Sequence, residues 1–445
     1  GRDSKEQGDN TPRPVKTIPA HFSVVRQADE QDVGNVFGHP DQNHLYIGLP
    51  LDMETPVCLN LPRFVERSNG IFGKSGTGKT FLTRLVLAGT IYSNQAVNLI
   101  FDMHSEYGWQ AAKEGGSSAY VKGLKQLFGS SVAIFTLDPE SARRRQVPVD
   151  FAVQIPYSQI EVEDIALLQD ELKLNNTAVE TAYQLVGHFK QENWLQQFLA
   201  CPDLEDLAQQ INGHPAALSA LHRKLSMLQT LPFVKPAVQD DAVKRILEHL
   251  DKGINVVLEF GQQNRMLTYM LVANILTRRI HRLYVEKCEK AMFGGGSKPK
   301  PLMITIEEAH KFLNPTAAKQ TIFGTIAREL RKFNVTLLIV DQRPSGIDSE
   351  VLSQVGTRVT CLLNDEHDIN AVLTGVSGAT RLRSVLATLD SKQQALLLGH
   401  AVPMPVVIRT RSYDEEFYRA VGFKDNRAMD EEFAKLVDDL YGVED

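Results

Sequence analysis

The clearest chemical signal in this 445-residue chain is a short glycine-rich stretch. Gly73, Gly78, Lys79 and Thr80 satisfy the pattern G-x-x-x-x-G-K-[ST]. Such glycines let backbone N–H groups turn toward phosphate oxygens, while the lysine reaches the β and γ phosphates and the threonine hydroxyl can ligate Mg²⁺. The apolar run at 81–88 predicts a helix that points its positive end at the anion, which a surface turn, the competing interpretation, would not need. We expect a nucleotide to contact Gly73, Lys74, Ser75, Gly76, Thr77, Gly78, Lys79, Thr80 and Phe81.

Two adjacent carboxylates end a later apolar stretch. Residues 302–306 predict a buried strand, and Glu307 and Glu308 follow it. In a strand beside the phosphate loop, the first acid can hold the Mg²⁺ shell and the second can orient the attacking water. We therefore assign a metal role to Glu307, together with Thr80, and a general-base role to Glu308. A solvated acidic strand end is the alternative, and the phosphate loop upstream disfavours it.

A glutamine and two arginines are further candidates. Gln342 follows the apolar run 336–340 and one acid, and an amide there can report on the γ-phosphate. An ordinary hydrogen-bonded glutamine is the competing interpretation. Arg328 and Arg331 lie three residues apart on a predicted helix and so share one face. In a ring they can reach a neighbour's ATP as arginine fingers, although a solvated basic face explains them equally well.

A third polar group follows the predicted strand 97–101. Asp102, His104 and Glu106 place three polar side chains within five residues. One histidine with two acids at this spacing is weak evidence for a transition-metal site. We favour a role in positioning water or the outer ligands of a bound ion.

The elements that position these residues alternate between strand and helix. This alternation predicts an α/β fold with a mostly parallel sheet and helices on both faces. Residues 157–250 have helical periodicity with few β-branched runs, which predicts an insertion subdomain. Short β-prone segments among turn residues predict part of a small barrel near the N-terminus. The predicted divisions are a disordered lead (1–20), a partial β-barrel (21–62), a two-part core (63–156 and 251–412), the helical insertion (157–250) and a helical tail (413–445).

Composition limits the classes of function. The formal net charge of −6 argues against a uniformly basic nucleic-acid coat but permits a local basic channel. Candidates for such a channel are Arg143, Arg144 and Arg145, and Arg381 with Arg383, though solvated turns explain both sets. The four cysteines form no C-x-x-C pair, which argues against zinc and a disulfide framework. Without an apolar run of about 20 residues, we expect a cytoplasmic protein with no membrane partner.

Five segments together resemble the HerA family of the FtsK/HerA ATPases. They are 73–80, 102–107, 306–310, 326–333 and 342–345, and their order and spacing extend the resemblance across 45–411. The resemblance implies a RecA-like P-loop NTPase core that uses ATP and Mg²⁺. It also implies a homo-hexameric ring that threads double-stranded DNA, with a nuclease or other effector as partner in DNA end processing or antiphage defence.

Residue roles also carry over from this resemblance. It implies that Arg328 reaches the nucleotide of a neighbouring subunit, whereas Arg409 and Arg411 contact the nucleotide of their own subunit. Two departures are visible: Glu307 stands where phosphate-loop ATPases generally have Asp, and Leu330 stands where relatives often have Gly. The expected function is an ATP-driven DNA translocase or helicase. The alternatives are a regulatory ATP-binding scaffold for an effector nuclease, and a coupling ATPase for secretion or conjugation, which the missing membrane segment disfavours.

Overall fold

The computed structural model describes residues 21–22, 24, 28–112, 120–320, 322–390 and 392–423. At residues 112, 319–320, 322 and 328–331 it describes the backbone alone. The lead predicted at 1–20 and residues 424–445 of the predicted tail lie outside these limits. In the described part of the tail, α19 (Glu415–Ala420) is helical.

Within the described residues, twelve strands form one sheet, in the order β2-β1-β16-β15-β14-β3-β13-β12-β4-β11-β7-β8. All neighbours from β14 to β8 are parallel, whereas the four strands at the other edge pair antiparallel. The mostly parallel α/β sheet predicted from the sequence is thereby confirmed. The parallel strands are β14 (Thr357–Thr360), β3 (Asn69–Phe72), β13 (Val335–Asp341), β12 (Leu302–Glu307), β4 (Val97–Asp102), β11 (Asn255–Glu259), β7 (Val132–Thr136) and β8 (Phe151–Ala152).

Two apolar layers sandwich the parallel strands. Successive strand residues point to opposite faces, so Ile100 packs in one layer and Leu99 in the other. The Ile100 layer includes the buried side of α3 (Lys79–Ser93), and the Leu99 layer includes α13 (Met266–Met292). Helices on both faces explain why these strands are buried along nearly their whole length. The same packing fixes α3, and hence the loop before it, against the sheet.

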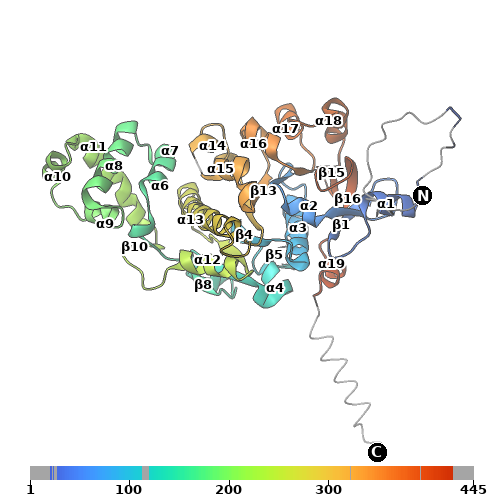
Figure 1. The fold of residues 1–445 in the computed structure, drawn as a ribbon, viewed down its shortest axis with the longest axis horizontal. Coiled ribbons are helices and arrows are strands. Elements are labelled where there is room, and N and C mark those ends of the chain that lie inside the picture. Colours follow the sequence, from blue (N-terminus) through green and yellow to red (C-terminus); the bar gives the residue numbers. More distant parts are fainter. Residues whose placement is uncertain are drawn as a thin grey trace, which may run out of the picture.

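The helical insertion forms the end of the molecule that lies farthest from both termini in Figure 1. A short parallel pair, β9 (Ile155–Pro156) with β10 (Val234–Lys235), closes its base. The next helix, α12 (Ala242–Asp251), packs against β11 and β4 and so covers the main sheet. The α-helices of the insertion are α6 (Val162–Leu167), α7 (Gln169–Leu172), α8 (Asn176–Phe189), α9 (Trp194–Leu199), α10 (Leu204–Gln210) and α11 (Pro215–Leu225).

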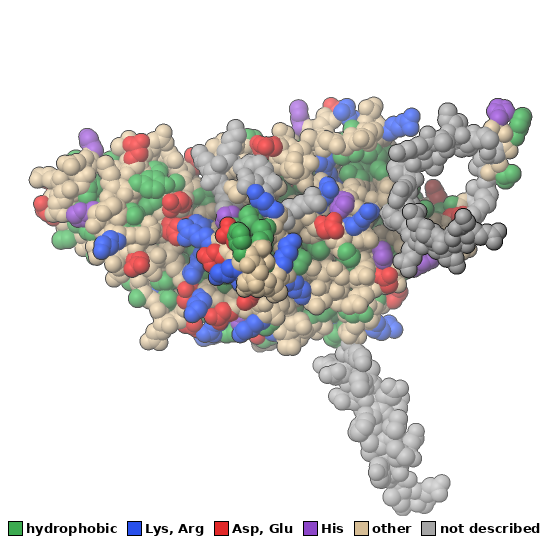
Figure 2. All heavy atoms as spheres, viewed as in Figure 1, with side chains coloured by type: hydrophobic (Ala, Val, Ile, Leu, Met, Phe, Trp, Pro, Cys, Tyr) green, Lys and Arg blue, Asp and Glu red, His purple; other side chains and the backbone are tan. Residues whose placement is uncertain are grey.

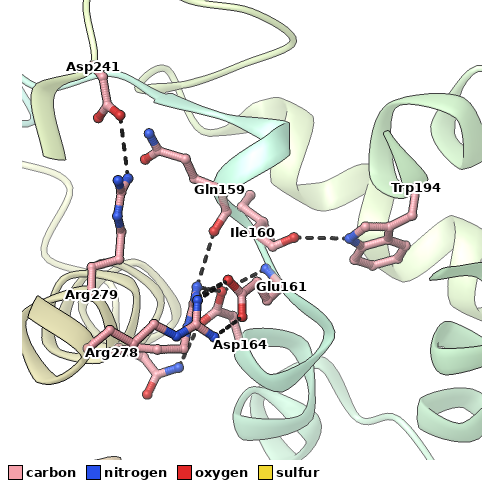
Figure 3. A network of polar contacts seen from close by, with 10 residues as sticks. Gln159, Ile160, Glu161, Asp164, Trp194, Asp241, Arg278 and Arg279 are labelled. Carbon is pink, nitrogen blue, oxygen red and sulfur yellow. Dashed lines mark hydrogen bonds and ion pairs between the residues drawn. The ribbon is translucent and has the colours of Figure 1, made fainter. Parts of the chain in front are cut away.

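A partly buried ionic network joins the insertion to α13 (Figure 3). Arg278 on α13 pairs with Asp164 of α6 at 2.7 Å and also with Glu161. Arg282, one helical turn further along, donates two hydrogen bonds of 2.9 Å to the Glu161 carboxylate. Burial raises the pKa of Asp164, and the Arg278 charge opposes this rise. The insertion is therefore fastened to the core by charged groups that depend on each other.

The partial barrel predicted for 21–62 is not confirmed. β1 (His44–Pro50) and β2 (Val57–Asn60) form a hairpin that joins the main sheet, because β1 pairs antiparallel with β16 (Val406–Thr410). β16 pairs in turn with β15 (Gln394–Gly399). Short β-prone segments indicate strands but not which partner edge they join, and here that edge comes from the distant C-terminal part of the chain.

No helix in the described part of the chain combines the length and apolar character that crossing a membrane requires.

Candidate active site

The glycine-rich loop joins β3 to α3. Gly73, Gly76 and Gly78 have φ values of 156°, 78° and 95°, which favour glycine. A Cβ atom at Gly76 or Gly78 would meet no atom within 4 Å, whereas one at Gly73 would lie 2.7 Å from the Cβ atom of Cys361. Open space therefore adjoins the loop at the positive end of α3, where an anion is stabilised.

Lys79 lies among the acids of the neighbouring strand ends. Its Nζ atom donates a 2.9 Å hydrogen bond to the Lys74 carbonyl oxygen. Burial lowers the pKa of Lys79, while Cys361, Glu308 and Asp341 nearby act in the opposite direction. The strand order explains this proximity, because β13, which ends at Asp341, lies between β3 and β12. The sequence prediction that these elements meet is supported by this arrangement.

Glu307 is held by one oxygen and free at the other. The Tyr107 hydroxyl donates a 2.8 Å hydrogen bond to Glu307 Oε1. Glu307 Oε2 is buried and has no hydrogen-bond partner among the described residues. Burial, followed by repulsion from Asp102, raises the pKa of Glu307 to about 8. The charge of a bound divalent cation favours the ionised form of such a group, and the buried, unpartnered oxygen fits the cation's water shell, so the residues present suit the Mg²⁺ that the phosphate loop implies.

Glu308 and Gln342 meet directly. The Gln342 amide donates a 3.2 Å hydrogen bond to Glu308 Oε1 from the end of the adjacent strand. Glu308 has a φ of 48°, a left-handed conformation that costs a non-glycine residue about 1–3 kcal/mol. Such strain persists at functional sites when the surroundings require it. The structure thus brings together the two residues for which the sequence predicted base and sensor roles.

Asp341 and His310 are site residues that the sequence analysis missed. The Asp341 carboxylate accepts a 2.7 Å hydrogen bond from the backbone N–H of His310 and lies 3.0 Å from its Nδ1 atom. The Asp341 carbonyl oxygen accepts a hydrogen bond from the N–H of Gly73 at 3.2 Å. This buried acid therefore ties the phosphate loop to the turn after Glu308. Asp341 directly precedes Gln342 in the sequence, and this position could have identified it as a site residue.

The side chains of Asp102, His104 and Glu106 do not form a cluster that could hold a metal ion. Asp102 is buried and accepts hydrogen bonds from the N–H groups of Glu106 and Tyr107, both at 2.9 Å, so it fixes the turn after β4. His104 is exposed, and no cluster of three metal-ligating side chains occurs among the described residues. Burial, and then the nearby Glu259, raise the pKa of Asp102 to about 7.

A cavity of about 430 Å³ adjoins the phosphate loop. Arg411 lines it, and the Arg411 guanidinium lies 4.6 Å from the ring centre of Tyr46. Arg409 instead pairs with Glu54 at 3.1 Å and lines a second cavity that shares Arg411. Apolar side chains of α3 and the ring of Tyr413 form part of the first cavity's wall. Its lining is Gly76, Thr77, Gly78, Phe81, Leu82, Leu85, Lys392, Gln393, Thr410, Arg411, Ser412, Tyr413 and Asp414.

Comparison with known proteins agrees with this geometry. The sequence profile described as "Helicase HerA, central domain" matches residues 45–280. The chain belongs to the HerA helicase family. The DNA double-strand break repair helicase HerA of Saccharolobus solfataricus is 25% identical over 89% of this chain and 74% of its own length. The protein of the same name from Pyrococcus furiosus is 22% identical over 81% of this chain and 68% of its own length.

Solved structures extend the comparison of folds. VirB4 of Thermoanaerobacter pseudethanolicus has a TM-score of 0.56 and 13% identity, covering 85% of this HerA-family chain and 98% of its own. The bacterial conjugative coupling protein TrwB has a TM-score of 0.53 and 11% identity, and the match covers 88% of this chain and 96% of the TrwB chain. The fold is thus that of a P-loop NTPase, and this member of the HerA family is an ATPase of the helicase class.

Arg328 lies on α15 (Ile322–Glu329), whose backbone is described. The side chains of Arg328 and Arg331, and that of Leu330, fall outside the described residues. The arginine-finger role in this HerA-family chain therefore stays a prediction. The backbone just before α15 is also helical, in α14 (Ala317–Gln320).

The basic residues proposed for DNA contact do not all point to solvent. Arg143 and Arg144 are exposed, but Arg145 pairs at 2.7 Å with the buried Glu259 at the end of β11. Arg381 and Arg383 lie exposed on α18 (Ala379–Ala387). On the face shown in Figure 2, Lys and Arg side chains are interspersed with Asp and Glu and form no single basic patch.

Proposed function

We propose that this HerA-family ATPase is a motor that moves along double-stranded DNA as a homo-hexamer. The observation that supports it most directly is the hydrogen bond between Glu308 and Gln342, which follow the carboxyl ends of β12 and β13, beside β3 and the phosphate loop after it. In α/β proteins this edge of the sheet is where ligands bind. Two relatives that align with most of this chain are named DNA double-strand break repair helicases, which supports DNA as the track.

Each residue of this constellation has a role in hydrolysis. The loop glycines and Lys79 bind the phosphates and stabilise the charge that develops on them. Glu308 receives a proton from the attacking water, and Gln342 orients that water and the Glu308 carboxylate. The acid must lie within hydrogen-bond reach of the water, and the contact with Gln342 fixes it in the site.

Thr80 and Glu307 would hold Mg²⁺ at this site. Thr80 lies in the first turn of α3, and Glu307 Oε2 is buried without a partner in the described part of the chain. When bound, Mg²⁺ supplies positive charge to the β- and γ-phosphate oxygens. Glu307 carries the longer side chain at a position where Asp is usual, so one more methylene separates its carboxylate from the strand.

The assay for this proposal is ATP hydrolysis with and without linear duplex DNA. Lys79→Ala should abolish turnover, whereas Glu308→Gln should bind ATP but turn over at least a hundredfold more slowly. Lys290→Ala, an exposed change on α13, is the matched control and should behave as the wild type. Full activity in Lys79→Ala would refute the site. Turnover that duplex DNA leaves unchanged would refute the motor and favour an ATP-binding scaffold that only positions an effector.

The ring proposal makes Arg328 a contributor to the neighbouring subunit's site. If so, Lys79→Ala subunits and Arg328→Ala subunits, each inactive alone, should regain part of the activity when mixed, because mixed rings contain some intact interfaces. Native mass spectrometry should show six subunits per ring. A fully active monomer would contradict this part of the proposal while leaving ATP binding intact.

We further propose that the motor works with a nuclease or another effector in DNA end processing or antiphage defence. The support is the double-strand break repair named for the relatives. Tagged protein isolated from its own host should retain an effector that mass spectrometry identifies, and with a nuclease effector the complex should degrade linear duplex only when ATP is present. Degradation at equal rates with Lys79→Ala protein would separate the nuclease from the motor.

A further inference from the structure

Tyr107 lies where it can control the carboxylate of Glu307. It is fully buried, and its hydroxyl donates a 2.8 Å hydrogen bond to Glu307 Oε1. Its backbone N–H donates a 2.9 Å hydrogen bond to Asp102 Oδ2, which fixes the Tyr107 backbone in the turn after β4. No other side chain among the described residues is hydrogen-bonded to the Glu307 carboxylate.

A second tyrosine fixes the backbone of the same residue. The hydroxyl of Tyr269, on α13, accepts a hydrogen bond from the Glu307 N–H and donates one to the Glu307 carbonyl oxygen, both at 3.2 Å. The two phenols act on different parts of Glu307. Tyr269 secures the main chain, whereas Tyr107 alone secures the carboxylate.

A phenol has one hydrogen to donate, so Tyr107 can engage only one carboxylate oxygen. It engages Oε1, and Oε2 is left buried without a partner in the described part of the chain. An unsatisfied buried oxygen is costly unless a ligand completes it. The hydrogen bond from Tyr107 therefore determines which oxygen of Glu307 remains available.

We infer that Tyr107 is the positioning residue for Mg²⁺ binding: its hydroxyl holds Glu307 in the orientation that presents Oε2 to the water shell of the ion. This inference rests on the metal role proposed for Glu307. Hydrogen-bond partners of metal-site side chains commonly change metal affinity by 10–100-fold when they are removed. Tyr107 itself touches neither nucleotide nor metal in this scheme.

Tyr107→Phe tests the inference, because it removes one oxygen and keeps the ring. Titrate Mg²⁺ while following binding of a fluorescent ADP analogue, and separately while following ATP hydrolysis. We expect the half-saturating Mg²⁺ concentration to rise about tenfold in both, with binding of the analogue in EDTA changed less than twofold. High Mg²⁺ should restore most of the hydrolysis rate. Unchanged Mg²⁺ dependence in both titrations would overturn the inference.

Tyr418→Phe is the matched control. Tyr418 is also buried, and its hydroxyl accepts a hydrogen bond from the Lys122 N–H, away from Glu307. It should keep the wild-type Mg²⁺ dependence. An equal shift in this control would mean that loss of any buried hydroxyl disturbs the site, which would also overturn the inference.

Two further variants separate the possible failures. If Glu307→Gln leaves Mg²⁺ dependence unchanged, the metal role of Glu307 fails, and the inference about Tyr107 fails with it. If Glu307→Gln shifts that dependence and Tyr107→Phe does not, only the inference about Tyr107 fails. Should Tyr107→Phe not fold, Asp102→Asn carries the test, because it loosens the turn that holds Tyr107; a wild-type Mg²⁺ requirement in that variant would count against positioning.

Discussion

The Gln342 Nε2 atom lies 3.2 Å from Glu308 Oε1 and 3.5 Å from Glu308 Oε2, so the side chains that follow two neighbouring strands are joined by hydrogen bonds. The Gln342 amide therefore contacts Glu308, the proposed general base, directly and not through a water molecule. From this position, Gln342 can hold the Glu308 carboxylate in one orientation when the γ-phosphate is present and in another when it is absent. Because of this contact, we expect Gln342 to affect the rate of ATP hydrolysis more than the affinity for ATP.

Gln342→Ala should lower the maximal rate of ATP hydrolysis about 10–100-fold, because Glu308 loses the amide that contacts its carboxylate and nothing orients the attacking water. The dissociation constant for ATP should change less than threefold. Gln354→Ala, an exposed change on α16 (Ser349–Gln354), is the control. A loss of affinity that matches the loss of rate would indicate a ground-state contact with nucleotide instead.

Arg411 and Arg409 should differ in their effect on nucleotide binding, although both were predicted to contact it. Arg411 lines the cavity beside the phosphate loop, whereas Arg409 pairs with the exposed Glu54. Arg411→Ala should weaken nucleotide binding about tenfold, and Arg409→Ala less than twofold. Calorimetric titration with ADP measures both. Equal losses would mean that Arg409 leaves Glu54 when nucleotide binds.

Glu161→Gln should lower the free energy of unfolding by about 1–3 kcal/mol at neutral pH, because Arg282 loses its carboxylate partner and Arg278 keeps only Asp164. Exposed Glu163 on α6 supplies the control, Glu163→Gln, which should change stability by less than about 0.5 kcal/mol. Urea unfolding followed by circular dichroism measures both.

The effect of Glu161 should also depend on pH. Burial acts to raise the pKa of Glu161, but hydrogen bonds and charge from Arg282 and Arg278 outweigh it and lower that pKa. A lowered carboxyl pKa stabilises the fold fully above the unfolded value of about 4.3 and loses this contribution as the pH falls through the folded value. The difference between wild type and Glu161→Gln should thus be constant from pH 6 to 8 and shrink below about pH 4. A constant difference down to pH 3 would contradict the ionic explanation.

DNA contacts can be located by charge reversal of exposed arginines. Arg143→Glu with Arg144→Glu should reduce the slope of log affinity against log salt by about 2 if both contact phosphates, without changing the melting temperature. Arg381→Glu with Arg383→Glu is the parallel test on α18. Whichever pair leaves the slope unchanged lies outside the DNA path. Arg145 is unsuitable, because reversing it would place a second acid beside buried Glu259.

Local patterns predicted the parts of the site that are local in the sequence. The phosphate loop, the strand that ends at Glu307 and the strand before Gln342 all have the expected form, because each depends on apolar runs and neighbouring polar residues. The contact of Tyr107 with Glu307 joins residues 200 positions apart. No periodicity in either segment specifies it, since it depends on β4 and β12 being neighbours in the sheet.

The predicted barrel was not confirmed for a similar reason. The short β-prone segments among turn residues were predicted to form part of a barrel, and two of them form the antiparallel pair β1 and β2. The partner of that hairpin is β16 (Val406–Thr410), which lies far beyond both strands along the chain. A pattern of short strands specifies local pairing much better than the order of strands in a sheet.

The position of β16 between β15 and β1 has a consequence during protein synthesis. β1 leaves the ribosome early, but the edge that it does not share with β2 stays unpaired until residues 406–410 have been synthesised. Until then the nascent chain exposes that edge, which is a template for aggregation. Arg411 and Tyr413 follow directly, so the wall of the cavity beside the phosphate loop is completed at nearly the same moment. A chain that terminates prematurely before residue 406 would thus carry a phosphate loop but lack one wall of its cavity.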